Sequence, residues 1–283
     1  SIVSTGGVSS VHLGRKYGFA KATTDARTVL DDSKTDIIVI ATRHDSHADY
    51  VVRALAAGKH VFVEKPLALT LEESARIEQA VEHAPRQLLM VGFNRRFAPQ
   101  VQKIKSLLDA VAGPKAFVMT VNAGPVPADH WTQDPNIGGG RILGEGCHFL
   151  DLLRYLAASP IASWQVVPLA AESRDTLTVS LRFADGSIGA IHYFANGNRA
   201  FPKERLEIFA SRGVLQLDNF RRLRGFGWPG FRRMNLWRQN KGQKACVKAF
   251  VDAVRNGHPA PIPAQEIIEV SRITIQIASA ING

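Results

Sequence analysis

The chain has 283 residues, a length that suits two domains better than one. With 45% hydrophobic and 21% charged residues, it has the composition of a folded globular protein, which excludes disorder for most of the chain. Its apolar runs fall far short of the roughly 18 residues that a membrane span needs, so we expect no membrane segment. Two cysteines, Cys147 and Cys246, exclude a disulfide framework, and the absence of a leader pattern predicts a cytoplasmic protein.

The formal net charge of +10 comes from one segment. Between Asp218 and Asp252 the chain has nine Lys and Arg residues and no acidic residue, whereas the rest is almost neutral. Aromatic residues accompany these charges, a mixture that lines some sites for single-stranded nucleic acid. The favoured interpretation is a solvated loop that also attracts small anions. We therefore predict no nucleic-acid partner, and keep nucleic-acid binding by residues 219–248 as an alternative.

The first 95 residues alternate between strand and helix patterns. Short apolar runs without polar alternation are typical of strands buried in a parallel sheet, and they lie at residues 1–3, 36–42, 60–64 and 88–93. Helices are predicted over residues 9–17, from a cap at Asp45 or Ser46, and after the capping box that begins at Thr70. The order predicts an α/β domain over residues 1–95, a Rossmann-like doubly wound parallel sheet whose first strand and glycine-rich turn are missing.

After this point the pattern changes. Alternating strands separated by hairpin turns are predicted at residues 116–121, 164–169, 176–183, 187–194, 206–210 and 214–217. Helices are predicted at residues 99–108, 142–157, 245–256 and 264–280. Residues 96–283 are therefore expected to form an α+β domain with a largely antiparallel, open sheet. We expect its helices to cover one face of that sheet or, for the last helix, to return to the first domain.

Polar residues follow the predicted parallel strands directly. Thr42, Glu64, Lys65 and Asn94 all lie at carboxyl ends, where a doubly wound sheet has its ligand crevice. No His, Cys, Asp and Glu residues have the spacing of a metal site, so none is predicted.

Three motifs resemble the Gfo/Idh/MocA oxidoreductases, the family of glucose-fructose oxidoreductase and inositol dehydrogenase. They are Gly58–Pro66 after Thr42 and His47, then residues 91–97, and a block at residues 138–151. Residues 127–133 are similar to members fused behind an alcohol-dehydrogenase-like domain. The resemblance implies hydride transfer between NAD or NADP and a hydroxyl-bearing carbon of a sugar, inositol or nucleotide-sugar. It also implies a cytoplasmic homo-oligomer that forms through the open face of the sheet.

The resemblance implies Lys65 and His148 as catalytic residues. Removing a hydride from a carbinol leaves a proton that a positioned base must take, and Lys65 brings positive charge to the developing alkoxide. Family members commonly have an aspartate four residues before the histidine, but this chain has Gly144 there. Glu145, three residues before His148 on the predicted helix, is the third catalytic candidate.

The remaining candidates are binding residues. Those expected to bind the cofactor are Ser4, Thr42, His47, Glu64, Lys65 and Asn94. Ser4 begins the segment where a ribose-binding acid is usual, which leaves NAD and NADP open. The small substrate is expected to be sugar-like, anionic ones included, because arginine suits carboxylate or phosphate, and its candidate partners are Arg95, His130, Trp131 and Arg141.

A rival hypothesis from another class is a non-catalytic, ligand-sensing module that keeps the same fold. The glycine at position 144 is the best argument for it. Hydride transfer, measured against cofactor binding alone, separates the two.

Overall fold

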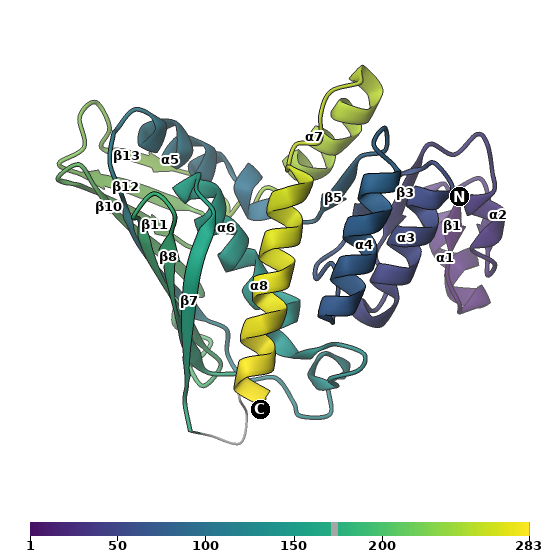
Figure 1. Ribbon diagram of the computed structural model, residues 1–283, viewed down its shortest axis with the longest axis horizontal. Helices are drawn as coiled ribbons and strands as arrows, with labels where there is room; N and C mark the ends of the chain where they lie inside the picture. Colours follow the sequence, from purple (N-terminus) through teal and green to yellow (C-terminus); the bar gives the residue numbers. More distant parts are fainter. Residues whose placement is uncertain (171–174, 283) are drawn as a thin grey trace.

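The computed structural model describes residues 1–170 and 175–282 of the chain. A smaller domain with parallel strands lies beside a larger domain that is built on an eight-stranded sheet (Figure 1). All parallel strands of the first domain end by Val91, and the larger sheet begins at Ala116. Within these residues no helix has the length and apolar character needed to cross a membrane.

Three parallel strands form the centre of the first domain, in the order β3 (Ile37–Ile40), β4 (His60–Val63) and β5 (Leu89–Val91). They are connected by α3 (His47–Ala56) and α4 (Leu71–His83). The apolar side chains of β4 and β5 are buried, which is why these strands occur as unbroken apolar runs. This arrangement confirms the predicted Rossmann-like parallel sheet.

A second, two-stranded parallel sheet lies at the N-terminal end of the chain. It consists of β1 (Ile2–Val3) and β2 (Ala22–Thr23), with α1 (Gly7–Tyr17) between them and α2 (Arg27–Leu30) after them. Within residues 1–170 and 175–282, no strand is hydrogen bonded to both β1 and β3. The first strand of a doubly wound sheet would do so. The described residues therefore form the sheet without that strand, as predicted, and Val39 on β3 is 63% exposed.

The larger sheet has the order β13-β12-β11-β10-β6-β9-β8-β7 and is antiparallel except between β6 and β9. Its strands are β6 (Ala116–Asn122), β7 (Ile161–Pro168), β8 (Leu177–Phe183), β9 (Ile188–Phe194), β10 (Glu204–Ala210), β11 (Gly213–Asp218), β12 (Arg222–Phe226) and β13 (Arg233–Asn235). The predicted largely antiparallel sheet is confirmed. The parallel pair at its centre was not expected, because the intervening helix α6 (Cys147–Ala157) and two strands separate β6 from β9 in the chain.

The charge of the basic segment suggested a solvated loop, but part of the segment forms two strands. Residues 222–235 form the edge hairpin β12–β13, in which Leu223 pairs with Met234 and both pack toward the core. The arginines alternate with them, so that Arg222, Arg224 and Arg233 are exposed. The alternation has the period of a strand, but the high charge hid it.

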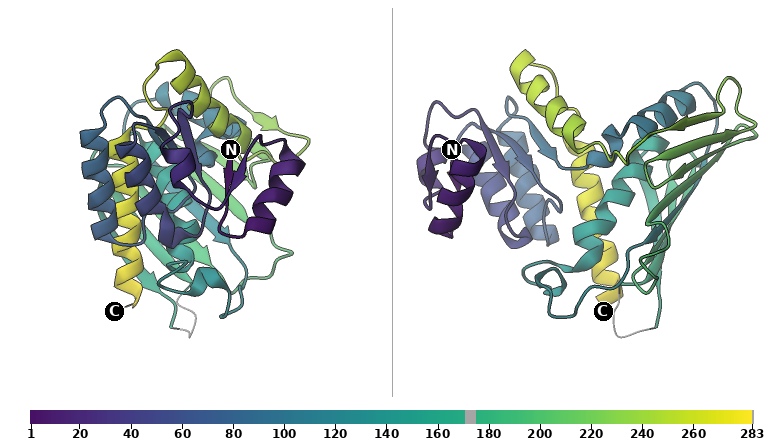
Figure 2. Two further views of the ribbon diagram at one scale, coloured as in Figure 1. Left: turned by 90° about the vertical axis from the view of Figure 1, so that its right-hand side faces the viewer. Right: turned by 180° about the vertical axis from the view of Figure 1, so that it is seen from behind.

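The helices cover one face of the large sheet. Those on this face are α5 (Pro99–Asp109), α6 and α8 (Ala264–Asn282), while α7 (Gln243–Asn256) projects above them (Figure 1). Helix α8 lies between the two domains and packs on α4 and β5 as well as on α6 and β7 (Figure 2). The opposite face carries no helix among the described residues and exposes the apolar side chains Val167, Ile188, Phe209 and Phe226. A homo-oligomer formed through this face stays a prediction.

Buried ion pairs connect α6 to its surroundings. The Arg96 guanidinium donates to both carboxylate oxygens of Asp151 at 2.8 and 2.9 Å, and to Glu266 of α8 at 2.5 Å. Arg154 of α6 donates to Glu269 of α8 at 2.9 Å. Since Asp151 has no solvent exposure, its charge depends on these partners. The cluster therefore holds α6 against α8.

The Asp151→Asn variant tests this dependence. It replaces the buried carboxylate beside Arg96 with a neutral amide and leaves the partly exposed Glu266 as the charged partner, and we expect a loss of about 3 kcal/mol in the free energy of unfolding, measured with urea. Asp49→Asn is the matched control, because it breaks the exposed pair with Arg53 and should cost only about 0.3–0.5 kcal/mol. Equal losses for the two variants would contradict the buried-charge argument.

Candidate active site

Lys65 reaches from the first domain to the second. It lies two residues after the end of β4, and its Nζ donates to the carbonyl oxygen of Gly144 at 2.6 Å. Gly144 lies in η4 (Ile142–Gly146), a π-helical turn that leads into α6. Such turns are frequent at functional sites, because their i→i+5 hydrogen bonds disturb the regular carbonyl ladder. The contact brings a strand-end amine to the start of the helix that carries His148.

Gly144 is needed for close packing. A Cβ atom at this position would lie 3.1 Å from Cε1 of His44, which belongs to the short helix η1 (His44–Ser46). The Nδ1 atom of His44 lies 2.7 Å from the carbonyl oxygen of Gly138, and burial lowers the pKa of His44 to about 4. The neutral ring of His44 therefore occupies the space beside position 144.

His148 is 6% exposed and packs edge-to-face on Phe93, with ring centroids 6.1 Å apart. Its Nδ1 atom is buried and has no hydrogen-bond partner among the described residues. Burial lowers the pKa of His148 well below its usual 6.5, and the nearby charges of Arg95, Lys65, Lys241 and Lys203 lower it further. The imidazole is thus neutral at neutral pH, and Lys65 lies close enough for its charge to lower the pKa of His148.

Glu145 has partners other than His148. Its carboxylate accepts from Lys203 Nζ at 2.5 Å, from the Tyr193 hydroxyl at 2.7 Å and from Arg141 at 3.3 Å. Burial alone would raise its pKa, but these three groups lower the pKa of Glu145 to about 2. The spacing argument for Glu145 assumed a regular α-helix, whereas the residue lies in a π-turn. A permanently ionised, triply bonded carboxylate is suited to holding cations in place.

The expected cofactor residues divide into two groups. Thr42 and Glu64 are exposed at the carboxyl ends of β3 and β4, and Ser4 is half-buried at the end of β1. The Glu64 carboxylate lies so close to Gly92 that a Cβ atom there would be 3.0 Å from it. Exposed polar groups at neighbouring strand ends fit a nicotinamide nucleotide, which binds in that crevice of such sheets.

His47 and Asn94, which were also predicted to bind the cofactor, are buried, and their polar atoms lie against backbone carbonyl oxygens. His47 is completely buried, with Nδ1 2.7 Å from the Pro66 carbonyl oxygen and Nε2 3.2 Å from that of Thr42. The Asn94 amide donates to the Lys241 carbonyl oxygen at 2.6 Å. Both side chains hold loops together, and His47 connects the two strand ends that carry Thr42 and Lys65.

Arg95 also differs from its expected role. Its guanidinium donates to both oxygens of Glu204, at 3.1 and 2.9 Å, and Lys241 donates to the same carboxylate at 2.6 Å. The side chain of Arg95 is buried, so it is a structural partner of Glu204 and not a free substrate group.

The other expected substrate residues, His130, Trp131 and Arg141, lie near η4. Trp131 lies edge-to-face against His44 at 4.8 Å, and the exposed His130 precedes it in the short helix η3 (Trp131–Gln133) and its cap. Arg141 donates to the carbonyl oxygen of Gly124 at 2.5 Å and to Glu145. Sequence reasoning missed Lys203 and Tyr193, since their contacts with Glu145 span 58 and 48 residues.

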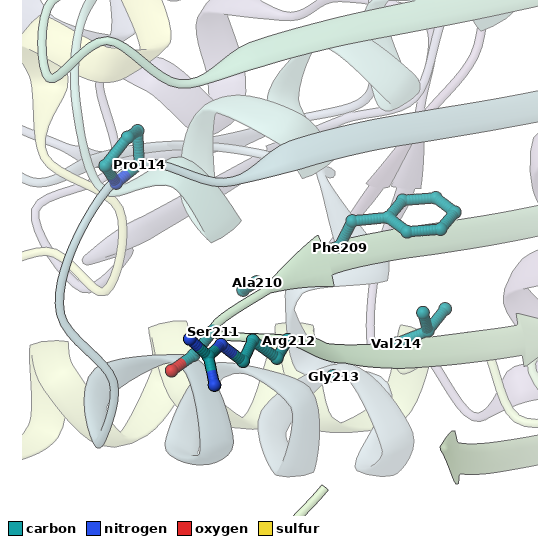
Figure 3. A pocket seen from close by; sticks show the side chains of 7 residues that line it. All are labelled: Pro114, Phe209, Ala210, Ser211, Arg212, Gly213 and Val214. Atoms are coloured by element: carbon teal, nitrogen blue, oxygen red, sulfur yellow. The ribbon is translucent and has the colours of Figure 1, made fainter. Parts of the chain in front are cut away.

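Two hollows are present on the second domain. One, of about 380 Å³, lies at the β10–β11 turn beside Pro114 and Arg212, and neither Lys65 nor His148 lines it (Figure 3). The other, of about 620 Å³, is lined by residues that include Arg141, Arg199 and Lys203. No group of His, Cys, Asp and Glu side chains in the described ranges is arranged to hold a metal ion.

Known proteins match both halves of the chain. Residues 1–93 match the model of the Gfo/Idh/MocA oxidoreductase family with its NAD-binding Rossmann fold, and residues 101–216 match the C-terminal domain model of that family. The myo-inositol 2-dehydrogenase of Thermotoga maritima is 27% identical over 274 residues, which cover 90% of this chain and 80% of that protein. The levoglucosan dehydrogenase of Pseudarthrobacter phenanthrenivorans is 27% identical over 246 residues, 75% of this chain and 63% of that protein.

The fold has close counterparts among solved structures. Levoglucosan dehydrogenase, in complex with NADH and levoglucosan, superimposes with a TM-score of 0.87 over 99% of this chain and 88% of its own, at 22% identity. A probable dehydrogenase from Thermotoga maritima has a TM-score of 0.80 at 24% identity, over 96% and 86% of the two chains. At this identity the likeness establishes the fold.

The Glu145→Gln variant tests the role of the Glu145 carboxylate, which binds the cations of Arg141 and Lys203. A carboxylate whose pKa is about 2 in the folded state and 4.5 otherwise stabilises the fold above pH 4.5, and this contribution is lost as the pH falls through 4.5 towards 2. We expect the variant to lose about 3 kcal/mol of unfolding free energy at pH 7 and less than half of that at about pH 3.

Urea titrations at both pH values measure this difference. Glu78→Gln is the control, since Glu78 forms a half-exposed pair with Arg272 and should change stability little. A loss that is small at pH 7, or one that does not depend on pH, would show that Glu145 is not held as an ion.

Proposed function

This chain belongs to the Gfo/Idh/MocA family of NAD-binding oxidoreductases, and we propose that it transfers a hydride between a nicotinamide dinucleotide and a hydroxyl-bearing carbon of a sugar or inositol. The observation that carries the proposal is the hydrogen bond from Lys65 to Gly144, which brings the strand-end amine beside the helix of His148. The relatives, which are dehydrogenases of inositol and levoglucosan, support the same chemistry.

When bound, the nicotinamide supplies the hydride acceptor or donor. Thr42 and Glu64, exposed at the strand ends, are the residues we propose to hold it, with Ser4 towards the ribose. Both NAD and NADP are compatible with this set, because no acidic side chain follows β1.

Lys65 is proposed to bind the substrate oxygen. One of its three N–H groups donates to Gly144, which leaves two for an oxygen at the reacting carbon. Within the described chain Lys65 forms no ion pair, so its full charge is available to stabilise an alkoxide as the hydroxyl loses its proton.

His148 is proposed to take the hydroxyl proton. A neutral imidazole has one nitrogen that accepts, and the lowered pKa of His148 keeps it neutral before the reaction. The four surrounding cations disfavour the imidazolium ion, so in this proposal the ring releases the proton to bulk water after the hydride has left. In the reverse direction the same ring returns it.

The Lys65→Met variant tests the proposal. Removing the ammonium takes away the charge that stabilises the alkoxide, and we expect kcat to fall by roughly 100-fold or more. Formation of reduced cofactor is followed by absorbance with a panel of inositols and monosaccharides, with NAD and NADP in turn. Lys34→Met, an exposed lysine at the opposite end of β3, serves as the control and should retain full activity.

Full activity in Lys65→Met would refute this role. Binding of a polyol without any hydride transfer in the parent protein would instead favour the ligand-sensing module.

The pH dependence tests His148 separately. Because its pKa lies well below 6.5, the base is in its active, neutral form across about pH 6–8, and kcat/KM should decline only at lower pH. A pH profile of kcat/KM measures the acidic limb. A midpoint at or above pH 6.5 would contradict a neutral, buried His148. An unchanged profile in His148→Gln would show that His148 is not the base that titrates.

A further inference from the structure

The larger hollow carries a positive charge, that of Arg199, which the hydride transfer does not use. Its volume of about 620 Å³ is within the range of small-molecule sites. The ionisable residues that line it are Arg141, Arg199 and Lys203, all of them cations, and none of its described lining residues is acidic.

Only part of this charge is balanced. Glu145 pairs with both Arg141 and Lys203, so one carboxylate serves two cations. Arg199 is exposed and donates through Nη2 to the carbonyl oxygen of Pro125 at 3.0 Å. No ion pair of the described residues includes it. Asp175, the further acid whose charge reaches Tyr193, accepts from the Gln133 amide and does not line the hollow.

Neither Lys65 nor His148 lines this hollow, but neighbouring contacts connect it to both residues. Lys65 donates to Gly144, and the next residue, Glu145, holds Lys203 on the wall of the hollow. The charge of Lys203 also acts on His148. A ring bound between Lys65 and His148 therefore has a cationic space beside it for one of its substituents.

From these observations we propose that the substrate is a monosaccharide acid whose carboxylate binds Arg199 in this hollow, an inference that rests on the proposed hydride transfer. A guanidinium with free N–H groups matches the two oxygens of a carboxylate. Arg199 is one cation without a counter-charge, and a carboxylate carries one negative charge. A phosphate monoester, which carries about 1.5 to 2 negative charges at pH 7, matches it less well.

The test compares acids with neutral sugars of the same stereochemistry. Isothermal titration of the full chain uses D-glucuronate against D-glucose and D-galacturonate against D-galactose, with glucose 6-phosphate as a third arm. We expect at least one acid to bind roughly tenfold more tightly than its neutral counterpart. Arg199→Gln should abolish that preference, because the variant removes one charge-assisted contact. Arg76→Gln, an exposed arginine on α4, should leave it unchanged.

The outcomes separate the two proposals. Neutral sugars that bind as well as the acids, binding of neither, or a preference that survives in Arg199→Gln would overturn the carboxylate site. A preference for glucose 6-phosphate alone would overturn it in favour of a phosphate site. An Arg199-dependent acid that binds but is not oxidised would keep the carboxylate site and refute the hydride transfer. Oxidation of neutral sugars only would support the hydride transfer and overturn the carboxylate site.

Discussion

The hydrogen bond between Lys65 Nζ and the Gly144 carbonyl oxygen makes one site out of two domains. Each side of this bond is held by buried structure. Lys65 follows a strand whose Val61 and Val63 side chains are completely buried, while the helix after Gly144 is fixed by the ion pair of Asp151 with Arg96. A disturbance of the α6–α8 contact would therefore move the carbonyl that orients the lysine. The packing between helices and the position of the reactive amine are parts of one constraint.

The glycine at position 144 changes the electrostatics of the site as well as its shape. Without a carboxylate at this position, the strongest charges acting on His148 are all cationic, and its imidazole is neutral, with one nitrogen that accepts. The same glycine allows the ring of His44 to approach, and no side chain stands between Lys65 and the backbone. In the sequence, the lack of an acidic residue at position 144 argued for a non-catalytic module. In the structure, this lack is compatible with proton transfer.

The sequence predicted the features that local pattern controls. Short apolar runs located β3, β4 and β5, and the strand-end motif located Lys65. It could not predict contacts that depend on distant partners, such as the pairing of Arg95 with Glu204, 109 residues away, which buries a proposed substrate residue. The orientation of Glu145 was missed for a different reason, since a π-turn shifts the helical phase by an amount that residue spacing does not reveal.

The cations around His148 follow a simple arrangement. Two carboxylates each hold two of them: Glu204 binds Arg95 and Lys241, and Glu145 binds Arg141 and Lys203. Arg95, Arg141 and Glu204 are buried while Lys203 is 40% exposed, and each of the four cations already has a carboxylate as its counter-charge. Lys65 and Arg199, by contrast, form no ion pair within the described ranges. A substrate that satisfies both would place an oxygen at its reacting carbon on one and a carboxylate on the other.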